Sequence, residues 1–140
     1  MSGRGGHIVV ALALGTGLSG CAQATAPADA EQPTLTYLGS AAKVLDDDLI
    51  NIFVSLDGAH LKGIAAREAA GRYADCAVAG HSLQRGYGFA RHIRTNVTED
   101  SGVWRADAVY TISRTLPRGI RTIDARAQVA TCAAEGIPTV

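Results

Sequence analysis

The chain has 140 residues, of which 47% are hydrophobic, 13 are acidic and 13 are lysine or arginine. A net charge of zero argues against a dedicated nucleic-acid-binding protein, because such proteins carry a marked excess of basic residues. The length suits a single folded domain.

The first twenty residues have the pattern of a secretory signal peptide. Arg4 and His7 precede an apolar run from Ile8 to Leu14, and small residues follow up to Gly20. The run is too short to span a bilayer, which takes about 20 apolar residues. We therefore predict a signal peptide over residues 1–20.

The sequence Leu18-Ser19-Gly20-Cys21 resembles the lipobox of bacterial lipoproteins. The resemblance implies that Cys21 carries a diacylglycerol, that the preceding peptide is removed, and that the new amino group receives a further acyl chain such as palmitate. Two or three acyl chains anchor a protein stably, because each buried methylene contributes about 0.8 kcal/mol. Ala22 at the next position implies, in that family, sorting to the outer membrane rather than retention in the inner membrane.

Residues 22–34 are rich in Ala, Pro and Thr and show no periodicity, which is typical of a disordered tether. A single domain is therefore expected over residues 35–140. Residues 35–44 have a mixed pattern, and Asp46, Asp47 and Asp48 predict a turn. Apolar and polar residues then alternate over residues 50–57, which predicts a half-buried strand as the second arm of a hairpin.

Residues 59–85 show helical spacing of small and apolar side chains. Asp57 is placed to cap this helix, and Gly86 is placed to end it. Gly71 and Gly80 each weaken the helix by up to about 1 kcal/mol relative to alanine. The sequence therefore predicts one long helix with a face that a sheet can approach closely.

Three alternating segments follow, at residues 87–97, 103–113 and 121–132. The first has an expected apolar face of Tyr87, Phe89, Arg91, Ile93 and Val97. Its opposite face comprises Gly88, Ala90, His92, Arg94 and Asn96. Together the elements predict an α+β fold in the order ββαβββ, with an antiparallel sheet of about five strands and one long helix packed on one face.

Two cysteines remain after Cys21, and these are Cys76 and Cys132. A secretory route leads to an oxidising compartment, which favours a disulfide over two free thiols or a reactive thiol. The expected layout opposes the bond, because the helix and a returning last strand place the two Cα atoms farther apart than the roughly 7 Å limit. We predict the disulfide on the grounds of compartment.

Arginine is the residue type that suggests a binding surface, because residues 85–126 contain eight arginines and four acids. The candidate residues are Arg94, Arg105 and Arg126 on the expected outer face of the sheet, and Arg118 and Arg121 in one turn. A guanidinium binds carboxylates and phosphates through paired hydrogen bonds, which suits anionic lipid headgroups, a cell-wall polymer or an acidic protein. The alternative is that Asp107 and Asp124 neutralise these arginines on a solvated surface.

The motifs HExxH, paired CxxC and GxSxG do not occur, and no histidine has a partner at metal-ligand spacing. We therefore expect no enzyme activity, no cofactor and no metal. The hypothesis is a lipid-anchored, periplasm-facing protein that acts as an interaction or envelope-maintenance module. Its expected partners are the membrane and a protein or cell-wall component, with no nucleic acid. The alternative is a binding module for a small anionic ligand between the helix and the sheet.

Overall fold

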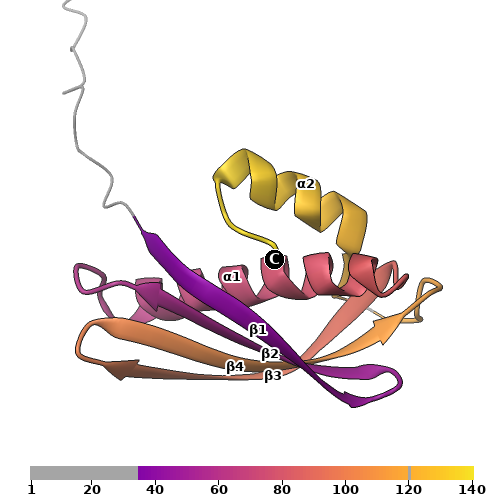
Figure 1. Cartoon of the computed structure of the whole chain (residues 1–140), viewed down its shortest axis with the longest axis horizontal. Coiled ribbons are helices and arrows are strands. Elements are labelled where there is room, and N and C mark those ends of the chain that lie inside the picture. Colours follow the sequence, from indigo (N-terminus) through magenta and orange to yellow (C-terminus); the bar gives the residue numbers. More distant parts are fainter. Residues whose placement is uncertain (1–34, 120) are drawn as a thin grey trace, which may run out of the picture. The chain divides into compact units, whose positions relative to one another are not determined.

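The computed structural model describes residues 35–119 and 121–140 (Figure 1). The expected signal peptide, the lipidation site Cys21 and the tether lie outside these residues. The described part contains a five-stranded antiparallel sheet and two helices, one of them long. This confirms the α+β class and the sheet with a long helix packed against it.

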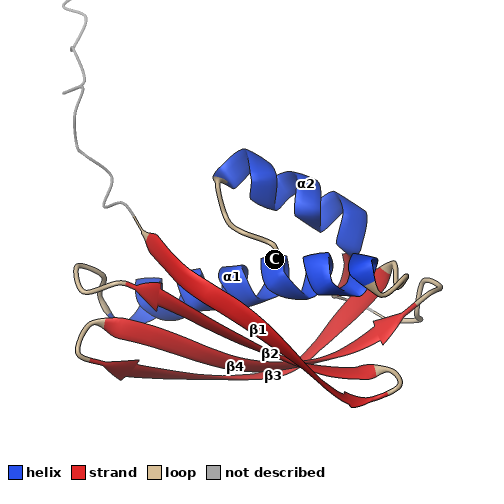
Figure 2. Cartoon of the chain, in the orientation of Figure 1, coloured by secondary structure: helices blue, strands red, loops and turns tan. Residues whose placement is uncertain are grey.

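The elements in chain order are β1 (Thr36–Asp46), β2 (Leu49–Asp57), α1 (Gly63–Gln84), β3 (Phe89–Asp100), β4 (Val103–Ser113), β5 (Thr122–Asp124) and α2 (Ala125–Glu135). The strand order in the sheet is β1-β2-β4-β3-β5, and every neighbouring pair is antiparallel. α1 carries the chain from β2 to β3, and β4 then returns between these two strands (Figure 2).

α1 lies at the centre of the core. Alternate residues of β2 and β4, among them Ile52 and Tyr110, are buried on the side of the sheet that packs against α1. From Tyr73 to Gly80 every residue of α1 except Asp75 is buried, because the sheet covers one side of this half and α2 covers another (Figure 2). The many alanines in this stretch allow the backbones to approach closely.

α1 is shorter at its start than the sequence indicates. It begins at Gly63, and Asp57 does not cap it, because Asp57 Oδ1 accepts a hydrogen bond from the backbone N–H of Ala59 (3.2 Å) in the preceding turn. Gly86 follows the helix with a φ of +79°, a left-handed conformation that glycine adopts without strain. The predicted role of Gly86 in ending the helix is confirmed.

The prediction of a last strand over residues 121–132 was wrong for most of its length. Residues Thr122–Asp124 pair with β3, and the chain then turns into α2. Asp124 starts this helix, because its Oδ1 accepts hydrogen bonds from the backbone N–H groups of Arg126 (3.0 Å) and Ala127 (3.1 Å). Two of the four residues on the alternating face that suggested a strand, Ala125 and Ala127, are alanine, which is the strongest helix former.

Cys76 of α1 and Cys132 of α2 form a disulfide, with Cα atoms 5.9 Å apart. The expected geometric conflict does not arise, because residues 125–135 form a helix that packs on α1 instead of a strand. An ion pair between Arg72 and Glu135 links the same two helices. The C-terminal segment also returns to α1, since a Cβ built on Gly80 would lie 2.6 Å from the carbonyl oxygen of Thr139.

β3 contains a bulge between His92 and Arg94, and this bulge changes which side chains face α1. A bulge adds one residue to one strand, so the alternation before it is out of phase with the alternation after it. Arg94 and Val97 lie on the predicted faces. Phe89 and Arg91 do not, because each pairs with a β4 residue that faces away from α1.

Candidate binding face of the sheet

The candidate site is the side of the sheet that faces away from α1, which we call the outer face. It is formed by alternate residues of the strands, which lie side by side in rows across the sheet. One row is Lys43, Asn51, Val109 and Arg94; the next is Ala41, Phe53, Asp107 and Asn96; the third is Gly39, Ser55, Arg105 and Thr98. Charged, polar and aromatic side chains therefore meet on this face.

A pocket of about 370 Å³ lies in the middle of the outer face. The ring of Phe53, which is 39% exposed, is its main apolar element. The polar side chains that line the pocket are Ser55, Asn96, Thr98, Arg105 and Asp107. An aromatic ring surrounded by hydrogen-bonding groups suits a ligand that has both an apolar surface and polar edges.

Arg94 and Arg105 lie on the outer face as predicted, and each is close to an aspartate. Arg94 Nη1 is 3.6 Å from Asp107 Oδ1, and Arg105 Nη1 is 3.9 Å from Asp100 Oδ2. The alternative interpretation, in which Asp107 neutralises an arginine, is therefore confirmed for Arg94. Ion pairs with this much solvent exposure contribute about 0–1 kcal/mol, so an anionic partner can displace them at little cost.

The other three candidate arginines are not part of the cross-strand rows. Arg126 lies in the first turn of α2, so its predicted position on a strand was wrong. Arg118 and Arg121 belong to the segment between β4 and β5, as expected. The guanidinium of Arg91 donates a hydrogen bond to the carbonyl oxygen of Arg118, which attaches this segment to one end of the outer face.

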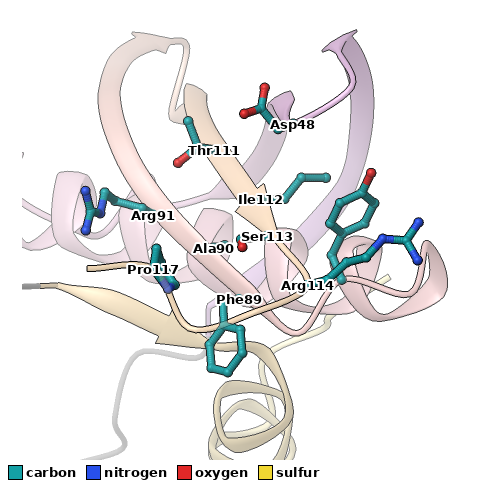
Figure 3. Close-up of a pocket in the computed structure, with 10 residues that line it drawn as sticks. Asp48, Phe89, Ala90, Arg91, Thr111, Ile112, Ser113, Arg114 and Pro117 are labelled. Atoms are coloured by element: carbon teal, nitrogen blue, oxygen red, sulfur yellow. The ribbon is translucent and has the colours of Figure 1, made fainter. Parts of the chain in front are cut away.

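A second pocket, of about 500 Å³, lies at the end of the outer face near the turn between β1 and β2. Figure 3 shows Arg91 and Arg114 on opposite sides of this pocket, with their guanidinium groups pointing away from each other. The Arg114 guanidinium lies 5.1 Å from the ring centre of Tyr87, and Arg91 is engaged with the Arg118 carbonyl. Both of these pockets lie on the outer face, whereas the alternative hypothesis of a small anionic ligand places its site between α1 and the sheet.

A polar cluster on the α1 side of the sheet has no signal in the sequence. Tyr110 donates a hydrogen bond to Asp75 Oδ1 (2.7 Å), and the His92 ring packs edge-on against Tyr110 with ring centres 5.3 Å apart. Burial raises the pKa of the Asp75 carboxyl, although the Tyr110 hydrogen bond and the nearby His92 oppose the shift. Burial and the adjacent Asp75 carboxylate raise the pKa of the Tyr110 hydroxyl. Because 35 residues separate Asp75 from Tyr110, no local spacing relates them.

The hydrogen bond between Tyr110 and Asp75 links β4 to α1 within this cluster.

Within residues 35–119 and 121–140, no three His, Cys, Asp or Glu side chains converge in a way that suits a metal ion. Among the same residues, no helix combines the length and the apolar character needed to cross a membrane.

Comparison with known proteins places the described domain in a recorded family. The sequence model of the YNQ4 C-terminal domain family matches residues 37–136. An uncharacterised 26.9 kDa protein in the nqo8 5′ region of Paracoccus denitrificans is 31% identical over 112 residues, which cover 80% of this chain and 42% of that protein. The chain thus spans less than half the length of this relative. No solved structure is significantly similar to the chain.

Proposed function

The chain belongs to the YNQ4 C-terminal domain family, and we propose that it is a lipid-anchored envelope protein that faces the periplasm and acts as a non-enzymatic interaction module. The observation that carries the proposal is the sequence Leu18-Ser19-Gly20-Cys21, which three residues separate from the end of the apolar run Ile8 to Leu14. The disulfide between Cys76 and Cys132 supports it, because such bonds persist in oxidising compartments. Ala22 favours the outer membrane as the site of the anchor.

The outer face is the proposed interaction surface. Arg105 and Asp107 line the pocket around Phe53, and Arg94 pairs with Asp107 beside it. The exposed ion pairs of Arg94 with Asp107 and of Arg105 with Asp100 can exchange for carboxylates or phosphates of a partner. The proposed partner is an anionic component of the envelope, either a cell-wall polymer or an acidic protein. The acyl chains on Cys21 would hold the domain within reach of it.

The anchor is tested by mass spectrometry of the protein purified from bacterial membranes. We expect a mature chain that begins at Cys21, carries the mass of the acyl chains and partitions into detergent. The matched control is Cys21→Ser, which we expect to lack acyl mass and to leave the membrane fraction. A native protein that retains Met1, or that is soluble without acyl mass, contradicts the proposal.

The interaction surface is tested by reversing its charge with the double substitution Arg94→Glu/Arg105→Glu. We expect a loss of at least about tenfold in cosedimentation with purified cell-wall sacculi, or in the yield of cross-links to an acidic partner in cells. The control is Arg85→Glu/Arg126→Glu, which makes the same change of charge at two exposed positions outside the strands. Equal binding by the two variants contradicts a role for the outer face.

A further inference from the structure

The two edges of the sheet differ in how well they are protected against pairing with a further strand. β1 forms one edge, and β3 forms the other beyond its short pairing with β5. The β3 edge has a bulge and several charges, which are features that prevent strands from joining edge to edge. Its charged residues are Arg94, Glu99 and Asp100. β1 has eleven residues, of which only Lys43 and Asp46 are charged.

Exposed apolar side chains gather along β1. Eight large apolar side chains are exposed in the described part of the chain, and Leu38, Val44 and Leu45 are three of them. Phe53, a fourth, is the β2 neighbour of Ala41. The register shifts of β1 fall at its two ends, so residues 39–44 pair regularly with β2. An edge of this kind is a template for a further strand.

We propose that this edge pairs with β1 of a second copy of the chain, antiparallel and about a two-fold axis at Ala41. Ala41 is the midpoint of β1, so this register centres the contact on the strand and on its regularly paired part. Ala41 then faces itself, Ser40 faces Ala42, and Gly39 faces Lys43. The two sheets become one continuous sheet, with both copies of α1 on the same side and the two outer faces joined.

The register sets no like charges opposite each other and matches the sizes of the opposed side chains. Lys43 lies opposite Gly39 of the second copy, and Asp46 lies opposite Thr36, so like charges do not face each other. Small side chains meet at the axis and allow the strands to approach to about 4.8 Å. Leu38 lies opposite Val44, so these two exposed side chains cover each other. This complementarity to itself favours a second copy over an unrelated strand.

The pairing is tested with the substitution Ala41→Cys in the full-length protein expressed in bacterial cells. Directly opposed residues of antiparallel strands have Cα atoms about 4.5–5.5 Å apart, which permits a disulfide. Cys76 and Cys132 are already bonded to each other and do not compete. We expect a disulfide-linked dimer on a non-reducing gel.

Two controls check the register and the edge. Lys43→Cys lies on the same strand, but the proposed register places its two thiols about 13 Å apart along the strand direction. Asn96→Cys lies on the opposite edge of the sheet, on β3. We expect both to remain monomeric. The absence of a dimer from Ala41→Cys, equal dimer formation by all three variants, or a cross-link from position 41 to a different protein would each overturn the proposal.

Charged substitutions at positions 38 and 44 provide a second test that does not need an introduced thiol. Leu38 and Val44 are exposed, so charged substitutions at these positions spare the core. In the purified full-length chain in detergent, Leu38→Glu/Val44→Glu sets like charges opposite each other, and we expect the dimer to weaken by about tenfold in sedimentation equilibrium. Leu38→Lys/Val44→Glu sets opposite charges there, and we expect it to keep the dimer. A monomeric wild-type chain, or equal affinities for the two variants, contradicts the pairing.

Discussion

The two helices are held in place by different means. α1 is surrounded from Tyr73 to Gly80, and its buried side chains pack against the sheet and against α2. α2 buries only Ala125 and Cys132, and is fixed by its disulfide, by the Asp124 cap and by the exposed ion pair between Arg72 and Glu135. A surface helix made largely of alanine buries too little apolar area to stay in place by packing, so a covalent link takes over that role.

The largest expected effect comes from removing a buried ring of α1. Tyr73 is buried and packs edge-to-face on Tyr37, with ring centres 4.8 Å apart. We expect Tyr73→Ala to lower the free energy of unfolding by roughly 3–5 kcal/mol in urea denaturation. Val129→Ala on the partly buried surface of α2 is the matched control, with an expected loss below about 1 kcal/mol. Similar losses at the two sites would mean that packing holds both helices alike.

The next effect comes from removing the disulfide. Cys76 and Cys132 are 56 residues apart, and a loop of this length stabilises a fold by roughly 2–4 kcal/mol. We expect Cys76→Ser/Cys132→Ser to lose about this amount. Hydrogen exchange should become fast in α2 and stay slow in the second half of α1. Equal protection of α1 and α2 in this variant would show that α2 does not depend on the bond.

Alanine substitutions at two glycines of α1 distinguish the effect of a steric contact on stability from the effect of helix propensity. A Cβ on Gly80 meets the Thr139 carbonyl oxygen, so we expect Gly80→Ala to cost roughly 1–3 kcal/mol. Apart from its chain neighbours and the backbone of its own helix, a Cβ on Gly71 meets nothing within 4 Å, so we expect Gly71→Ala to gain up to about 1 kcal/mol. Thermal unfolding of the two variants measures both changes. A stabilising Gly80→Ala would mean that the C-terminal segment does not rest on α1.

The same contrast explains which elements could be predicted from the sequence. β2 and β4 each bury one face against the core, and so does the first half of α1, so their hydrophobic periods of two and of about 3.6 residues are visible in the sequence. α2 buries almost nothing, and its alternating alanines fit a strand as well as a helix. The deciding group is Asp124, whose carboxylate caps the helix after only three residues of β5. The disulfide, which was predicted on the grounds of the expected compartment, is present, but the helix that makes it possible was not predicted.

The candidate site was predictable only where strand alternation continued without interruption. Arg105 lies on the unbroken strand β4, and alternation correctly placed it on the outer face. Arg91 lies on the outer face and not on the predicted face, because the bulge between His92 and Arg94 reverses the alternation. Arg126 lies in α2 and not on a strand. These errors share a cause, since a bulge and a helix cap depend on hydrogen bonds that hydrophobic periodicity does not reveal.

The smallest expected effect concerns the partly buried Asp75 in the otherwise buried half of α1. Burial raises the pKa of its carboxyl above the ordinary value of 3.8, so the folded protein holds this proton to a higher pH than the unfolded chain does. The stability that Asp75 contributes is therefore greatest in acid, and it falls as the pH rises through the interval between the two pKa values.

Asp75→Asn removes this titration and keeps an oxygen that can accept the Tyr110 hydrogen bond. In urea denaturation between about pH 4 and pH 7, we expect the stability of the wild type to decline relative to that of Asp75→Asn as the pH rises. Glu68→Gln, at an exposed carboxylate of the same helix, is the control. A constant difference between wild type and Asp75→Asn, or one that grows in favour of the wild type at higher pH, would contradict a burial penalty at Asp75. In that case the ionised Asp75 carboxylate would not destabilise the fold.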